Sequence, residues 1–431
     1  MHAMLSEQQL EDIEKSPYKA DFPLLSQNPD LTFLDSAATA QRPEAVLDAM
    51  REFYTTMNAN PLRGLYRLSV EATSAIDEAR NKIARFIGAV DEKGNPQGSQ
   101  IVFTRNASES LNLVARTLGP KVVLGPDDEV AISIMEHHSN LIPWQQLCRQ
   151  TGAKLTYLRL DDDYRITPEE VAAKIGPHTK IVSVTQVSNV LGVQNDVKAI
   201  ARRAHEVGAY MVVDGAQSVP HIAVDVRDLD CDLMAFSAHK LGGPMGIGVL
   251  WGKPEVLDAM PPFLTGGEMI DAVTETDALW APVPQKFEAG TQDAAGSFAT
   301  GVAIDYLAGH GMDALERRER ELATYLCDSL AALPYVDLIG PADGSRHVGA
   351  VAFNVRGVHP HDVASILDMS QVCIRAGHHC AQPLLSYLKV ENGATCRASV
   401  AFYNDKQDVD RLVEGLDRVW SLFGGAVTGK A

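Results

Sequence analysis

The sequence predicts an α/β protein built on a large, doubly wound, mostly parallel sheet of seven strands and completed by a smaller C-terminal α+β domain. Between residues 101 and 252, seven short apolar runs alternate with amphipathic helical stretches. Strands that are apolar along their whole length and are separated by helices are typical of a parallel sheet covered on both faces. Beyond a pair of long helices, the pattern changes to shorter mixed elements.

The elements of the large sheet follow in chain order. The apolar runs expected to form strands are 101–103, 129–134, 154–158, 181–185, 210–213, 233–236 and 248–251. The helical stretches between them are 109–118, 144–152, 168–175 and 197–208. Ligands of such sheets bind beyond the carboxyl ends of the strands, so we expect the functional residues there.

The flanking segments predict how the chain divides. Before the sheet we expect a helix over 5–15, a loop at 21–23, a strand at 31–34 and helices over 43–57 and 69–88. After it come an irregular stretch to about 296, helices over 298–309 and 312–333, an α+β unit formed by 348–355, 361–368, 372–375 and 396–402, and a helix over 408–423. The expected parts are an N-terminal segment (1–30) packing with the small domain, a large domain (31–308) and a small domain (309–431).

Composition excludes several classes of protein. Hydrophobic residues make up 45% and charged residues 22% of the 431 positions, which is ordinary for a soluble protein. The net charge of −18 argues against non-specific nucleic-acid binding, which needs clustered Lys and Arg. No apolar stretch approaches the roughly 18–20 residues that span a bilayer, and the polar, acidic start lacks a secretory signal pattern. Six scattered cysteines without a C-x-x-C motif predict neither a disulfide framework nor a zinc ribbon, which fits a reducing cytoplasm.

Lys240 is the first candidate catalytic residue. It follows the apolar run 233–236 and precedes a glycine-rich turn at 242–248. Burial next to a strand end lowers the pKa of a lysine, and a neutral amine can form a Schiff base with an aldehyde. The alternative is a surface lysine in a turn, but the flanking Ser-x-His-Lys-x-x-Gly-Pro pattern favours the catalytic interpretation.

Asp214 and the stretch 104–110 fit an aldehyde cofactor that carries a phosphate. Asp214 closes the apolar run 211–213, and pyridoxal phosphate needs a carboxylate beside its pyridinium nitrogen. The alternative for Asp214 is a helix N-cap. The stretch 104–110 opens a helix whose free N–H groups, together with the Ser108 hydroxyl, would hold a phosphate; ordinary capping by Ser108 is compatible with this.

Two histidine-containing segments carry further candidates. His137 lies in Glu-His-His after an apolar run and could stack on a cofactor ring or act as an acid or base. Cys380 lies in the polar stretch 375–383, which we expect to be a loop, beside histidines and an arginine that favour a thiolate. The histidine pairs lack the i, i+4 spacing of a helical zinc site, so no metal is expected. The cysteines expected to be buried or inert are Cys148, Cys231, Cys327, Cys373 and Cys396.

Together these residues resemble the fold-type I pyridoxal-phosphate enzymes and, within them, the group II cysteine desulfurases of the SufS/CsdA kind in the class V aminotransferase family. The likeness runs from about residue 21 to residue 423. The segments that carry it are 236–244, 375–383, 135–140, 187–192 and 287–291. The segment 375–383 resembles the active-site loop of group II and is the most specific.

This resemblance implies a role for each candidate. The residues implied to bind pyridoxal 5'-phosphate are Lys240 as the Schiff-base lysine and proton carrier, Asp214 at the pyridinium nitrogen, Gln217 at the ring hydroxyl, His137 on the ring, Ser108, Ser237 and His239 at the phosphate, and Thr291 reaching the phosphate from a second subunit. Those implied to act on the substrate are Asn189 and Arg397 at its carboxylate, Arg375 near its sulfur, and Cys380 as the nucleophile.

The activity that the resemblance implies is the conversion of L-cysteine to L-alanine, with the sulfur held as a persulfide on Cys380. An acceptor protein of the SufE/SufU kind would take the sulfur for iron–sulfur cluster assembly, and the enzyme would be a cytoplasmic homodimer. A selenocysteine lyase would use the same residues. Another class V enzyme, such as a C–S lyase or an aminotransferase, would not need Cys380, and a non-enzymatic scaffold partner would be expected to lack Lys240 or Asp214.

The chain departs from the family pattern at two places near the expected site. The family usually has H-R-G-I-H before its second helix, whereas Leu62 and Tyr66 replace both histidines here. The phosphate turn usually has two threonines and here reads Ala107-Ser108. The loops at 91–99 and 390–394 are also longer than typical.

Overall fold

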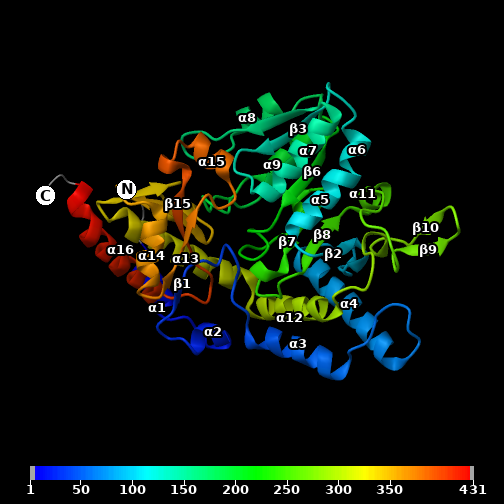
Figure 1. The fold of residues 1–431 in the computed structure, drawn as a ribbon, viewed down its shortest axis with the longest axis horizontal. Helices are drawn as coiled ribbons and strands as arrows, with labels where there is room; N and C mark the ends of the chain where they lie inside the picture. Colours follow the sequence, from blue (N-terminus) through cyan, green and yellow to red (C-terminus); the bar gives the residue numbers. More distant parts are fainter. Residues whose placement is uncertain (1–4, 428–431) are drawn as a thin grey trace.

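The computed structural model describes residues 5–427, so the ends of the predicted N-terminal segment and C-terminal domain, residues 1–4 and 428–431, lie outside the described residues. Two large sheets organise the described chain and lie next to each other along the long axis of the molecule (Figure 1). Both ends of the described chain lie at the side of the smaller sheet (Figure 1).

The larger sheet confirms the predicted fold class. Its seven strands run in the order β2 (Ile101–Thr104), β8 (Gly248–Gly252), β7 (Leu233–Ser237), β6 (Tyr210–Asp214), β5 (Thr179–Thr185), β3 (Glu129–Ser133) and β4 (Lys154–Leu158). Strand β8 is antiparallel to both of its neighbours, and every other pair of neighbours is parallel. Each of the seven predicted apolar runs forms one of these strands.

Two layers of helices cover the sheet because alternate strand residues face opposite sides. Met211 and Val213 of β6 belong to one apolar core, and Val212 between them belongs to the other. The helices of the first core are α3 (Glu44–Thr56), α4 (Arg67–Phe86), α9 (Val197–Glu206) and α12 (Ala294–His310). Those of the second are α5 (Ala107–Thr117) and α7 (Ile142–Thr151). The shorter helices near this sheet are α6 (Gly119–Val122), α8 (Pro168–Lys174), α10 (Val226–Leu229) and α11 (Pro254–Ala259).

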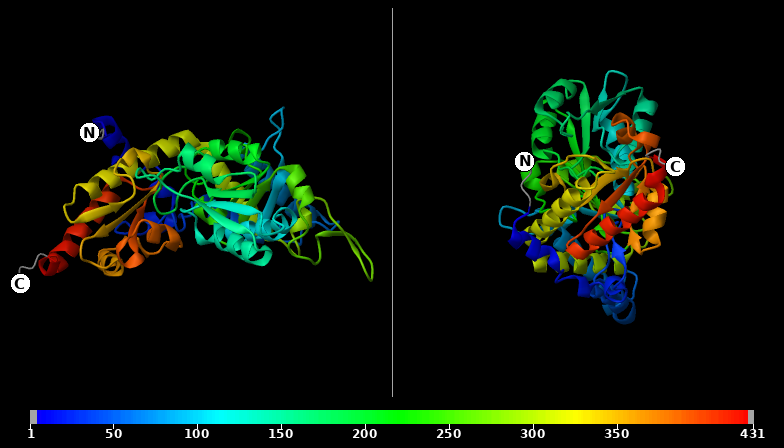
Figure 2. Two further views of the ribbon diagram at one scale, coloured as in Figure 1. Left: turned by 90° about the horizontal axis from the view of Figure 1, so that it is seen from above. Right: turned by 90° about the vertical axis from the view of Figure 1, so that its left-hand side faces the viewer.

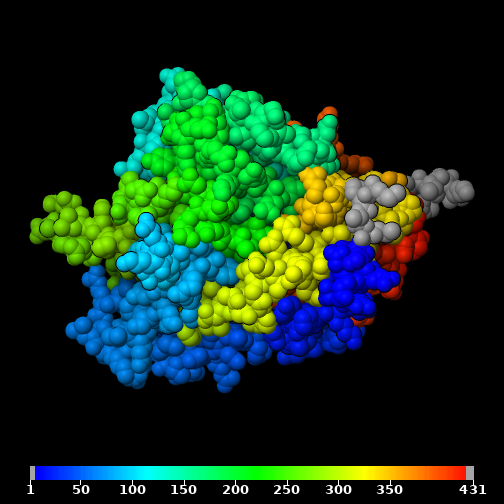
Figure 3. Space-filling model, turned by 180° about the vertical axis from the view of Figure 1, so that it is seen from behind, coloured from blue at the N-terminus to red at the C-terminus, as the bar shows by residue number. Residues whose placement is uncertain are grey.

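The smaller sheet is antiparallel. Its strands run in the order β11 (Val336–Ile339), β12 (Ala350–Val355), β15 (Thr395–Ser399) and β14 (Arg375–Gly377). Its apolar core is shared with the helices α1 (Glu7–Glu14), α13 (Met312–Ala331), α14 (Pro360–Asp368) and α16 (Lys406–Val427). Helix α1, dark blue in Figure 3, lies beside the yellow residues of α13. A capping box between Ser6 and Gln9 begins α1.

A separate two-stranded sheet precedes the passage of the chain from the smaller sheet to the larger one. Strand β1 (Thr32–Phe33) pairs in parallel with β13 (Val372–Cys373), so the chain passes the small sheet before it enters the large one. Asp35, two residues further on, forms an isolated bridge with Ser399 at the end of β15. Ala37 and Ala38, next along this passage, line the cavity described below.

Three stretches that the sequence predicted as irregular or as loops contain regular elements. The stretch after residue 252 was expected to be irregular, but it contains α11 and a hairpin of β9 (Ile270–Val273) and β10 (Ala278–Trp280) that projects from the body of the molecule; Figure 2 shows it extended. Val273 and Leu279 are 63% and 64% exposed, so the hairpin lacks the burial pattern that predicts a strand. The expected loop at 21–23 is a pair of short helical turns, η1 (Lys19–Asp21) and α2 (Pro23–Ser26).

The third is the segment 375–383, which is not a loop throughout. It begins as strand β14, which pairs with β15, and ends in helix α15 (Gln382–Tyr387). The strand forms through backbone pairing with a distant segment, which local pattern does not reveal. Pro383 lies in the first turn of α15, where a missing N–H is tolerated. Within residues 5–427, no helix is both long and apolar enough to cross a membrane.

Candidate active site

A cavity of about 230 Å³ lies where the carboxyl ends of the central strands meet the smaller sheet. Ten of the predicted site residues line it: Ser108, His137, Asn189, Asp214, Gln217, Ser237, His239, Lys240, Arg375 and Arg397. They come from segments far apart in the sequence, so the tertiary fold assembles them into one site. The location agrees with the expectation that ligands bind beyond the strand ends.

Lys240 lies in the short 3₁₀ turn η4 (Ala238–Lys240) that follows β7. Burial lowers the pKa of its ammonium to about 8, although the nearby Asp214 acts in the opposite direction. The neutral amine is therefore more populated near physiological pH than it is in an exposed lysine. This is the form that attacks an aldehyde, so the environment supports the predicted Schiff-base role.

Asp214 is the last residue of β6 and is buried. Its Oδ1 accepts a hydrogen bond from the Ala216 N–H at 2.9 Å, so it caps the turn after the strand rather than a helix. Burial raises the pKa of this carboxyl group. A cationic ring nitrogen bound beside Asp214 would favour the carboxylate form, because an opposite charge offsets the cost of burial. Gln217, in the same turn, donates a hydrogen bond from its side chain to the Ala37 carbonyl at 2.7 Å.

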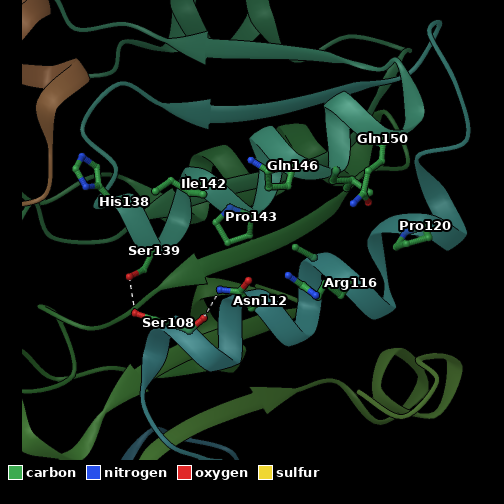
Figure 4. Close-up of a pocket in the computed structure, with 12 residues that line it drawn as sticks. Ser108, Asn112, Arg116, Pro120, His138, Ser139, Ile142, Pro143, Gln146 and Gln150 are labelled. Carbon is green, nitrogen blue, oxygen red and sulfur yellow. Dashed lines mark hydrogen bonds between the residues drawn. The ribbon is translucent and has the colours of Figure 1, made fainter. Parts of the chain in front are cut away.

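The start of α5 has the features of a phosphate site. Asn106 caps the helix, and the Ala107 N–H donates to Ser237 Oγ at 2.8 Å. Gly248 of β8 backs onto this turn, since a Cβ atom there would lie 2.4 Å from the Asn106 backbone. Unpaired N–H groups and the helix dipole favour an anion at this end of a helix. The Ser108 hydroxyl, 2.5 Å from Ser139 Oγ, lies at the same end (Figure 4).

His137 follows β3 and faces the same cavity. Its Nδ1 accepts a hydrogen bond from the Ser139 N–H at 3.1 Å, which holds the ring in place. Burial, and secondarily the charge of Lys240, lowers the pKa of His137 to about 3. The imidazole is therefore neutral at physiological pH, and a neutral ring can lie against a cofactor ring.

Two arginines lie side by side on neighbouring strands of the smaller sheet. Arg375 of β14 is the register partner of Arg397 of β15. Arg397 is buried; its Nη1 donates to the Asn189 carbonyl at 2.8 Å, and its Nη2 lies 2.9 Å from Asp35 Oδ1. The Asn189 side chain donates to the His379 carbonyl at 2.8 Å. The two guanidinium groups make this end of the cavity suitable for a carboxylate.

Cys380 lies between β14 and α15 and is half-buried. His379 and Cys380 both have left-handed backbone conformations, with φ of 49° and 56°. His379 lines the cavity, whereas Cys380 itself is not among the lining residues. Burial raises the pKa of the Cys148 thiol to about 11 and that of Cys327 to about 12, so these sulfurs are poor nucleophiles.

Besides Cys380, one other predicted residue is not among those that line the Lys240 cavity. Thr291 lines a separate cavity of about 280 Å³, together with Thr104 and Arg105, and is not among the residues that line the Lys240 cavity of its own chain. Its predicted contact from a second subunit stays a prediction. Leu62, which replaces a family histidine, has a φ of 78°, and the nearby Leu65 is fully exposed.

The sequence interpretation assigned no role to three residues of the site. Asp35 binds Arg397, Ser139 links Ser108 to His137, and His379 is buried with its Nδ1 unpartnered. A short run of small residues after Asp35 was the only local signal for the first. No group of His, Cys, Asp and Glu suited to a metal ion occurs in the described part of the chain.

The fold and the site define an enzyme of the pyridoxal-phosphate-dependent class, because a buried lysine, a carboxylate and a phosphate-binding helix start surround one cavity. The chain belongs to the class-V aminotransferase family, whose model matches residues 32–412. It is 48% identical over 406 residues to a probable cysteine desulfurase of Halalkalibacterium halodurans, covering 94% of this chain and 97% of that protein.

Two solved structures are also similar over almost the whole chain. The cysteine desulfurase CsdA (S-sulfonic acid) of Escherichia coli has a TM-score of 0.85 and 39% identity, covering 94% of this chain and 98% of that one. The apo cysteine desulfurase of Thermococcus onnurineus has a TM-score of 0.86 and 37% identity, covering 97% and 99%. These matches confirm the predicted resemblance to the cysteine desulfurases, the predicted fold class and pyridoxal phosphate as the cofactor.

Proposed function

We propose that this protein is a cysteine desulfurase that converts L-cysteine to L-alanine and transfers the sulfur to Cys380. The observation that carries the proposal is that Lys240, from the large sheet, and His379, next to Cys380, line the same cavity. A desulfurase needs an amine and a thiol at one site. Here the amine, Lys240, follows strand β7 of the larger sheet, and the thiol, Cys380, follows strand β14 of the smaller sheet. The similarity to proteins named cysteine desulfurase supports the same activity.

The residues of the cavity fit pyridoxal phosphate. Bound there, the cofactor supplies an electron sink that labilises the bonds at the substrate Cα and Cβ. Lys240 would hold its aldehyde carbon, Asp214 its ring nitrogen and Gln217 its ring hydroxyl, while His137 would lie against the ring. Its phosphate would bind at the start of α5. The residues proposed to contact the phosphate are Ser108, Ser237, His239 and, from a second copy of the chain, Thr291.

The protein's own groups would then carry the reaction. Arg397 and Asn189 would orient the substrate carboxylate, Arg375 would lie near its sulfur, and the neutral Lys240 amine would take the Cα proton. The Cys380 thiolate would attack the substrate sulfur: an S–S bond forms while the Cβ–S bond breaks, and the carbon skeleton keeps that electron pair. One proton completes the methyl group at Cβ and another returns to Cα, so L-cysteine and a thiol give L-alanine and a persulfide.

The test is to add L-cysteine to the purified holoenzyme and measure alanine together with the mass of each cysteine peptide. We expect alanine and one extra sulfur atom on Cys380. Cys380→Ser should abolish both, whereas Cys373→Ser, which removes the other half-buried thiol, should leave them unchanged. Sulfide release at the wild-type rate from Cys380→Ser would instead indicate a C–S lyase.

The proposed function also includes a sulfur acceptor, a second copy of the chain and a cellular compartment. A sulfur-accepting protein of the SufE/SufU kind would take the persulfide sulfur for iron–sulfur cluster assembly. The resemblance implies a homodimer in which Thr291 reaches the phosphate of the partner subunit. Thr291 lies outside the Lys240 cavity of its own chain, as that role requires, and sedimentation velocity would test the dimer. The six cysteines are all free thiols, which is compatible with the cytoplasm. Comparing rates on L-cysteine and L-selenocysteine would separate a desulfurase from a selenocysteine lyase.

A further inference from the structure

The backbone around Cys380 adopts a conformation that needs external support. His379 and Cys380 are consecutive non-glycine residues with positive φ, a region that side chains with a Cβ rarely adopt. Such conformations persist where surrounding contacts hold them. The contacts that hold this loop therefore determine where the Cys380 sulfur lies.

His138, the first residue of the 3₁₀ turn η3 (His138–Asn140) beyond β3, supplies two of these contacts. Its N–H donates to the Cys380 carbonyl at 2.7 Å. Its side-chain Nε2 accepts from the Gln382 N–H at 3.3 Å, at the first residue of α15. The two bonds hold the chain on either side of Ala381. Two other bonds hold His379: Asn189 donates to its carbonyl at 2.8 Å, and its own Nε2 lies 2.9 Å from the Thr395 carbonyl.

The side-chain bond requires a neutral imidazole. Nε2 accepts a hydrogen bond from an amide, so it must carry a lone pair, and the ring proton then lies on Nδ1. Burial, and secondarily the neighbouring His378, lowers the pKa of His138 and favours this form. His138 also lines a groove of about 570 Å³ between α5 and α7, where Figure 4 shows it next to Ser139.

We propose that His138 is a positioning residue for sulfur transfer: its imidazole holds the start of α15 and thereby directs the Cys380 thiol toward the Lys240 cavity. This rests on the proposed desulfurase function. The adjacent residues His137 and His138 then divide the work, since His137 lines the cavity and His138 contacts the thiol loop.

The test compares His138→Ala with His138→Gln in the holoenzyme. Glutamine places an amide oxygen close to the position of Nε2, so it restores the acceptor. Loss of one neutral hydrogen bond corresponds to a change of about five-fold. For His138→Ala we expect kcat for alanine formation to fall about five-fold, with KM for L-cysteine unchanged. His138→Gln should recover most of kcat.

A second measurement reports on the loop itself. Hydrogen exchange of the amides at 380–387 should be faster in His138→Ala and close to wild type in His138→Gln, with the rest of the chain unchanged. His178→Ala, an exposed histidine before β5 at the opposite end of the sheet, is the matched control. Unchanged exchange at 380–387 in His138→Ala would overturn the proposal, as would equal loss of kcat in both variants. A wild-type enzyme that forms no persulfide would overturn the proposed function instead, whatever the exchange shows.

Discussion

Arg397 Nη2 lies 2.9 Å from Asp35 Oδ1, although the two residues are 362 positions apart in the sequence. The guanidinium proposed to bind the substrate carboxylate is therefore already paired with a carboxylate of its own chain. The Arg397 side chain is 2% exposed and that of Asp35 is 25% exposed, so Asp35 is the more accessible member of the pair. An incoming substrate carboxylate must bind against this negative charge.

Replacing Asp35 with Asn should strengthen substrate binding. Asparagine keeps the shape of the aspartate side chain and one hydrogen-bond acceptor, but it removes the negative charge that competes with the substrate carboxylate. We expect KM for L-cysteine to fall about three-fold. Steady-state kinetics measures this, with Arg397→Lys as a comparison that should raise KM because lysine cannot bind a carboxylate in a bidentate manner. A higher KM in Asp35→Asn would mean that Asp35 orients Arg397 rather than competing with substrate.

Addition of pyridoxal phosphate to the cofactor-free protein should become faster with rising pH. The pKa of Lys240 is lowered to about 8, and only the neutral amine attacks the aldehyde. The protonated fraction dominates below that pKa, so the rate should rise as the pH passes through about 8, where half of the amine is neutral. Stopped-flow absorbance at several pH values measures the rate. Lys240→Ala should show no such phase, and a midpoint near the ordinary lysine pKa of 10.5 would contradict the effect of burial.

Gly248→Ala should weaken cofactor binding. A Cβ at this position would lie 2.4 Å from the Asn106 backbone, so β8 and the start of α5 would have to separate. The phosphate site depends on that helix start, and we expect the dissociation constant for pyridoxal phosphate to rise at least about ten-fold. Fluorescence titration measures it. Gly309→Ala, where no atom lies within 4 Å of the added Cβ, is the control and should bind normally.

Arg80→Ala should destabilise the large sheet. Arg80 Nη2 lies 2.5 Å from Glu288 Oε2, and the two side chains are 5% and 2% exposed. Removing the cation leaves a buried, unpaired carboxylate, which costs about 3–5 kcal/mol. Urea unfolding followed by circular dichroism measures the loss in the free energy of unfolding. Arg67→Ala, which removes an exposed pair with Glu71, should change it by less than about 1 kcal/mol.

The sequence predicted the parts of the fold that local burial encodes. All seven strands of the central sheet were found because each contains a short run of mainly apolar residues between helical stretches. The hairpin β9–β10 was missed because its apolar side chains face outward, and β11 was missed because exposed Asp337 interrupts a four-residue run. The strand β14 was predicted as part of a loop because its pairing partner, β15, lies about twenty residues further along the chain.

In the site, too, some features follow from the local sequence and others depend on contacts between distant segments. The sequence by itself determined the chemical groups: Lys240 after a buried strand, Asp214 at a strand end, and Cys380 among polar residues. Only the tertiary structure decided which groups meet, since the Asp35–Arg397 pair and the His138–Cys380 contact join segments hundreds of residues apart. Local sequence sets the burial and conformation of each segment, whereas contacts between distant segments depend on how the two sheets pack.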